Sequence, residues 1–176
     1  MSNVENTSKE RFEQFEFDDE FEQKILAFLV RDIAFFRKNF HVMKASYFVS
    51  KIREDVYDKA SQYSRKYKEP IPQEALRQEI DRMYRATKKK DVPIDMYFEL
   101  LDDLYGRDLS GGGYAEDKVI GFAQAQEMAN AIKDGVNRIL SGKDLRPILT
   151  GVTKALEIGA KDIWDTLTGD QVLAHG

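Results

Sequence analysis

Apolar residues at helical spacing are the feature that most limits what this chain can fold into. In residues 21–29, 48–67 and 76–84 the large apolar side chains recur every three or four residues, which is the period of one face of an α-helix. No stretch shows the alternation of apolar and polar residues that is typical of a β-strand. We therefore predict an all-α fold, in which a small helical bundle is followed by an antiparallel helical hairpin.

The hairpin is predicted from a narrower apolar stripe in the last third of the chain. Its residues recur at steps of three and four, as in a coiled-coil seam, and the sequence Gly142-Lys143-Asp144 makes a turn between two helices. Pro147 fits this pattern because proline is tolerated in the first turn of a helix. The stripe consists of Phe122, Ala125, Ala129, Ile132, Val136, Ile139, Leu145, Leu149, Val152 and Leu156.

Two helices alone cannot bury a stripe of this length between them. We therefore expect these ten residues to form an interface with a second copy or with another protein. Trp164 joins them as a candidate contact, because no local pattern would bury its side chain.

The same patterns divide the chain into five parts. We expect a disordered tail over residues 1–17, a helical bundle over 18–107, a glycine-rich joint over 108–115, the hairpin over 116–159 and a linker over 160–176.

The glycine run Gly111–Gly113 stands before a long helical pattern, where a phosphate-binding loop could lie. A Walker-type loop needs a preceding strand and a lysine followed by serine or threonine. Here no strand precedes the run, Lys118 is followed by valine, and Glu116 and Asp117 would repel a phosphate. We interpret Gly111, Gly112 and Gly113 as a hinge that lets the hairpin swing relative to the bundle.

The remaining polar clusters favour solvated surface over chemistry. Neither His41 nor His175 has a second histidine or a cysteine at ligand spacing, so no metal, catalytic or cofactor-binding residue is predicted. Asp102 and Asp103 are expected on the outer face of their helix, between Leu101 and Leu104. The run Thr87–Lys90 could touch a DNA backbone, but basic residues at a helix end also complement the helix dipole.

Charge and composition narrow the class of protein. The formal net charge is −4, which disfavours general nucleic-acid binding, and the absence of cysteine is typical of an intracellular protein. The most apolar segment, Ile25 to Val30, is far shorter than the roughly 20 residues of a membrane span. We expect a cytoplasmic protein with no membrane contact.

The order of these parts is similar to that of a known family. The segment EQKILAFLVRDIAFFRKNFHVMKASYF, with a turn ending in Tyr47 and Phe48, resembles the opening of the N-terminal domain of DnaB-type replicative DNA helicases, most closely the bacteriophage branch. The proline-punctuated loop KEPIPQEAL and the later segment TKALEIGAKDIWDTLTG also match that layout, the latter resembling the approach to a motor domain that this sequence lacks.

The resemblance implies a non-catalytic collar rather than an enzyme. In this family the domain helps to build a hexameric ring, with hairpins pairing between subunits, and it docks primase and helicase loader proteins. It implies a homo-oligomer in a bacterial or phage-infected cell that meets DNA only indirectly and needs no cofactor. The alternative is a free-standing regulator or loader adaptor that mimics the collar.

Overall fold

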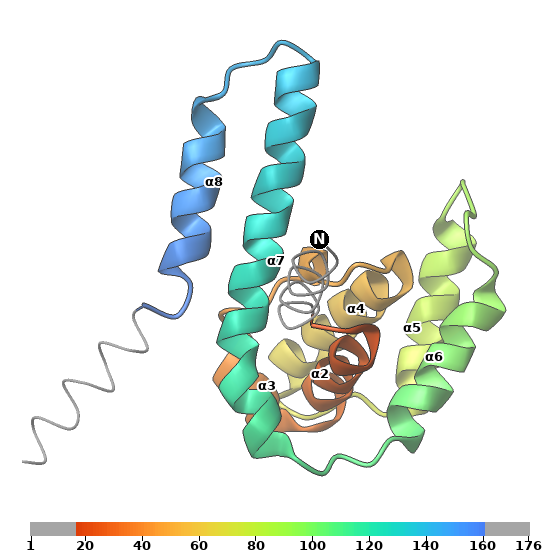
Figure 1. Ribbon diagram of the computed structural model, residues 1–176. Coiled ribbons are helices and arrows are strands. Elements are labelled where there is room, and N and C mark those ends of the chain that lie inside the picture. Colours follow the sequence, from red (N-terminus) through yellow and green to blue (C-terminus); the bar gives the residue numbers. More distant parts are fainter. Residues whose placement is uncertain (1–16, 161–176) are drawn as a thin grey trace, which may run out of the picture.

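Every regular element in the described part of the chain is a helix, so the predicted all-α class is confirmed. The computed structural model describes residues 17–160. Figure 1 shows a bundle of shorter helices beside the long helix α7, with α8 on the far side of α7. The helices are α2 (Asp19–Arg31), α3 (Ile33–Asn39), the 3-10 turn η1 (Ala45–Tyr47), α4 (Lys51–Tyr67), α5 (Gln73–Ala86), α6 (Ile94–Gly106), α7 (Gly112–Leu140) and α8 (Arg146–Glu157).

Local sequence signals set several helix ends. Asp18 accepts a hydrogen bond from the Phe21 amide at 2.8 Å, and Asp32 accepts from the amides of Ala34 and Phe35, so both carboxylates cap free N–H groups. Helix α4 ends at Tyr67 because Lys68 adopts a left-handed conformation, with φ of 62°. The chain is thus already out of the helix before Pro70 is reached.

Helix α2 forms the centre of the bundle. All six residues from Ile25 to Val30 are at most 2% exposed, and α2 packs against α3, α4, α6 and α7. A helical segment that is apolar on all sides, as residues 25–30 are, must be surrounded by protein. Within residues 17–160, no helix combines the length and the apolar character that crossing a bilayer requires.

A buried ion pair links α2 to α4. Glu22 is 3% exposed, accepts a hydrogen bond from the Val49 amide at 2.8 Å and lies 3.3 Å from the Arg53 guanidinium. Burial raises the pKa of Glu22 above its ordinary value, although the Val49 amide and Arg53 oppose this shift. Arg53 also pairs with Asp19 at 2.6 Å, so this cation has two carboxylate partners.

An aromatic cluster corrects the predicted boundary between bundle and hairpin. Phe122, assigned to the interface stripe, is fully buried, and its ring lies 5.5 Å from that of Phe17, 6.0 Å from Phe21 and 6.2 Å from Phe48, measured between centroids. Phe17, assigned to a disordered tail, is part of the same cluster. The first half of α7 therefore belongs to the core of the bundle, because its apolar residues face α2, α3 and η1.

The glycine run is also placed differently from the prediction. Gly111 has a φ of 75° and precedes α7, but Gly112 and Gly113 are already helical. A Cβ atom on Gly112 would lie 3.2 Å from the ring of Phe28, so this residue packs against the core. Gly112 and Gly113 lie within α7, which runs unbroken for 29 residues from the bundle into the hairpin, so they do not form a joint between two elements. A hinge at Gly111 stays a prediction. The remaining tail and linker residues, 1–16 and 161–176, lie outside the described residues.

Candidate interface on the helical hairpin

Small residues hold α7 and α8 close together. A Cβ atom on Gly135 would lie 3.2 Å from the Ile148 side chain, and one on Gly151 would lie 3.0 Å from the Ala131 Cβ. Ala155, the next small residue along α8, is 1% exposed. Because these two glycines have no side chains, the backbones of α7 and α8 can approach closely.

A row of large apolar side chains beside this seam remains in contact with solvent. Ile132, Val136 and Ile139 on α7 are 57%, 49% and 62% exposed. Leu149 and Leu156 on α8 are 72% and 69% exposed. We call the hairpin face the set Ala125, Ala129, Ile132, Val136, Ile139, Leu145, Leu149, Val152 and Leu156.

Helix geometry places the α7 and α8 rows on the same side of the hairpin. Five members of the hairpin face directly follow a residue of the seam in the sequence, and successive residues on a helix are rotated by about 100°. Because α7 and α8 run in opposite directions, this one-residue step turns both rows toward the same side. The seam and face residues pair as Ala131 with Ile132, Gly135 with Val136, Ile148 with Leu149, Gly151 with Val152 and Ala155 with Leu156.

Polar contacts fix the lower part of the hairpin against the bundle. Lys44 pairs with Glu127 at 3.2 Å, and Asn130 donates a hydrogen bond to the Ser46 carbonyl. The carboxylate of Glu127 also helps to raise the pKa of the Tyr47 hydroxyl, after burial, which is the larger cause. The distal ends of α7 and α8 stand away from the bundle and form the top of Figure 1. The base of the hairpin therefore contacts the bundle, while its distal face is accessible.

Nine of the ten stripe residues predicted for the interface lie on the hairpin face, and one lies elsewhere. Phe122 is wrong as an interface residue, because it is buried in the bundle. Val152 is half-buried beside the seam, and Ala125 and Ala129 are exposed. Trp164 lies outside the described residues. Leu140 was not among the predicted residues, although it is 81% exposed at the tip of α7.

The other polar candidates lie at the surface. Asp102 accepts a hydrogen bond from Gln73 at 2.8 Å, and Asp103 pairs with Arg107 at 2.7 Å, so each has a local partner. His41 is exposed after the end of α3, and His175 lies outside the described residues. Between residues 17 and 160, no group of three histidine or acidic side chains is arranged to hold a metal ion.

No family model, curated protein or solved structure matches the chain. The arrangement of the hairpin and the bundle is therefore the basis for a functional proposal, together with the layout of the sequence.

Proposed function

We propose that this chain is a non-catalytic collar domain of a DnaB-type replicative helicase, serving ring assembly and the docking of primase or loader proteins. The observation that carries the proposal is the hairpin face, a row of aliphatic side chains whose large members, apart from Val152, are half-exposed to largely exposed. Contiguous apolar patches on a protein surface usually mark sites of association. The similarity of the sequence layout to that of the helicase domain supports the more specific role.

A second copy of the chain is the occupant that best fits the hairpin face. All of its members are aliphatic, so an identical face is chemically complementary to it, whereas a charged partner would leave charges unpaired in the contact. A two-fold axis brings the same patch of two subunits together without any further surface. The distal part of the hairpin stands clear of the bundle, which leaves room for a second hairpin alongside it (Figure 1).

The bundle is proposed as the docking surface for partner proteins. Its core is complete without the distal hairpin, because the buried cluster ends on α7 at Ala123 and includes only residues from α2 to the first half of α7. Pairing of hairpins would therefore leave the outer surfaces of α4, α5 and α6 available to other proteins.

Sedimentation equilibrium of the intact chain from micromolar to millimolar concentration tests this proposal. We expect a reversible rise in mass toward a dimer or a higher multiple of the chain. Addition of a helicase motor ring or of primase should then give a complex whose stoichiometry follows that of the oligomer. A chain that is monomeric throughout and binds neither protein would sink the proposal. A monomer that binds the ring would instead favour the collar-mimicking regulator.

A further inference from the structure

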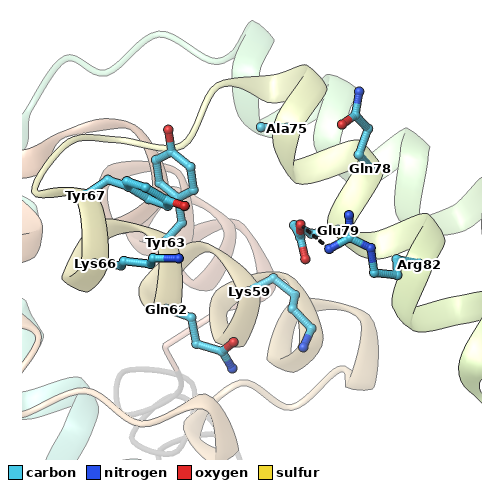
Figure 2. A pocket seen from close by; sticks show the side chains of 9 residues that line it. All are labelled: Lys59, Gln62, Tyr63, Lys66, Tyr67, Ala75, Gln78, Glu79 and Arg82. Carbon is cyan, nitrogen blue, oxygen red and sulfur yellow. Dashed lines mark hydrogen bonds and ion pairs between the residues drawn. The ribbon is translucent and has the colours of Figure 1, made fainter.

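A cleft between α4 and α5 lies on the bundle, remote in sequence from the hairpin. Its volume is about 400 Å³, and Figure 2 shows its walls: one row of side chains from α4 facing one row from α5. Both rows follow helical spacing, since Lys59, Tyr63 and Lys66 lie on one side of α4, and Ala75 and Arg82 lie on one side of α5. The cleft is therefore built by two regular helices rather than by a loop.

Positive charge predominates in the cleft. Lys59, Lys66 and Arg82 line it together with a single carboxylate, that of Glu79, which lies 2.9 Å from Arg82. The position of Lys66 in the last turn of α4 also suits the helix dipole. Lys59 lies mid-helix, where that dipole gives no reason for a cation, and its ammonium pairs at 3.7 Å with Asp58, which does not line the cleft. This local excess contrasts with the net charge of −4 for the whole chain. It favours an anionic ligand.

Aromatic rings complete one end of the cleft. The rings of Tyr63 and Tyr67 lie 4.5 Å apart, and Tyr67 is 52% exposed. The Lys66 ammonium lies over the Tyr67 ring, 4.9 Å from its centre, so this cation must leave the ring before a base can stack on the same face (Figure 2). Ala75 is the single aliphatic side chain that lines the cleft, which gives an amphipathic peptide helix no apolar row to pack against.

We propose that this cleft binds a single strand of nucleic acid, with phosphates on Lys59, Lys66 and Arg82 and one base stacked on Tyr67. Cations that track a backbone beside a ring that stacks a base are the two components by which proteins hold single strands without reading sequence. The basic residues Lys88, Lys89 and Lys90 follow the C-terminal end of α5 but do not line the cleft, and Lys89 pairs with Asp91 at 3.4 Å, so they are not counted among its phosphate contacts. The inference stands on the cleft alone and does not require that the hairpins pair.

Fluorescence anisotropy of the intact chain tests this inference. The probes are fluorescein-labelled oligodeoxyuridylate and oligouridylate of about twelve nucleotides, which differ only in the 2′-hydroxyl and have a length suited to a short single-strand site. Each phosphate contact contributes about −0.7 to the slope of a plot of log affinity against log salt concentration. Three contacts therefore predict a slope of about −2. Tighter binding of the deoxyuridylate identifies DNA as the natural ligand, and tighter binding of the uridylate identifies RNA.

Matched variants separate the cleft from general charge. Tyr67→Ala should weaken binding at least about fivefold, because stacking on one ring contributes this much or more, and Tyr67→Phe should retain it. Tyr114→Ala is the control, since Tyr114 is 64% exposed and has Lys118 5.6 Å from its ring centre, but does not line the cleft. Lys59→Ala should reduce the salt slope by about 0.7, whereas Lys118→Ala should leave it unchanged.

Three results would overturn the inference. One is the absence of binding to both oligonucleotides at low salt. Another is an equal loss of affinity in the Tyr67→Ala and Tyr114→Ala chains. The third is equal competition by an acidic peptide. If unlabelled oligoglutamate displaces the probe as well as unlabelled oligonucleotide does at the same concentration of charge, the ligand is an acidic peptide. The mass of each variant, measured separately, reports on hairpin pairing and keeps the two proposals distinguishable.

Discussion

Truncation of Leu149 on the hairpin face should weaken self-association without unfolding the chain. The side chain is 72% exposed in the single chain, so Leu149→Ala removes few contacts within it. Full burial of a leucine side chain contributes a free energy of about 1.5 to 3 kcal/mol. Because Leu149 is largely exposed in the single chain, roughly half to three quarters of this free energy is available for association. A two-fold pair buries this residue twice, once on each copy. We therefore expect Leu149→Ala to weaken the free energy of association by about 3 kcal/mol, which raises the dissociation constant roughly a hundredfold.

The assay for Leu149→Ala is sedimentation equilibrium at several loading concentrations, with urea unfolding as the check on the fold. Met96→Ala is the matched control, because Met96 is 48% exposed on the bundle and lies outside the hairpin face. The reasoning would be refuted by a dissociation constant for Leu149→Ala within about threefold of that for the unaltered chain, since additive burial on both copies predicts far more.

Three further predictions concern the fold. Phe122→Ala should lower the free energy of unfolding by about 3 to 5 kcal/mol in urea denaturation; a loss below about 1 kcal/mol would mean that the ring serves an interface instead. Gly113→Ala should stabilise the chain by about 0.5 to 1 kcal/mol, because the residue is helical with open space around it. Gly111→Ala should destabilise the chain, because the φ of Gly111 is 75°. Equal shifts of the melting temperature for the two variants would contradict this prediction. Since burial raises the pKa of Glu22, its ionisation disfavours the folded state. The unaltered chain should therefore lose stability relative to Glu22→Gln as pH rises from about 4 to 7, and a relative gain would show that pairing with Arg53 dominates.

The helices could be predicted from the sequence because each has a local cause. Apolar spacing and the caps at Asp18 and Asp32 act within a few residues, so they are legible without knowledge of the fold. The hairpin turn could be predicted for the same reason, with Gly142 adopting a φ of 62° after the end of α7.

The assignment of Phe122 failed because a helical period identifies a face but not its partner. The apolar row of α7 is continuous in the sequence, yet its first part packs on α2 and η1 while its later part is exposed. Only the position of the bundle separates these two environments. The large size of Phe122 among the alanines that follow it is a signal that could have indicated a core residue.

The seam between α7 and α8 was missed because small residues carry little weight in an apolar pattern. Gly135 and Gly151 allow close approach in the structure, but in the sequence a glycine within a helix indicates a weak point rather than a contact. The spacing of Ile148, Gly151 and Ala155, at steps of three and four, is the signal that was available. Recognising it would have assigned the larger residues beside it to the exposed row.

Concentration-dependent protection of one thiol tests the pairing of hairpin faces most directly. The chain has no cysteine, so Val136→Cys and Val49→Cys each introduce a single thiol, the first in the hairpin face and the second on the bundle, where Val49 is 80% exposed. We predict that the rate of labelling by a neutral maleimide falls for Val136→Cys as protein concentration rises, while the rate for Val49→Cys stays constant. Labelling of Val136→Cys at the same rate across the whole concentration range would contradict the claim that a second copy covers this face.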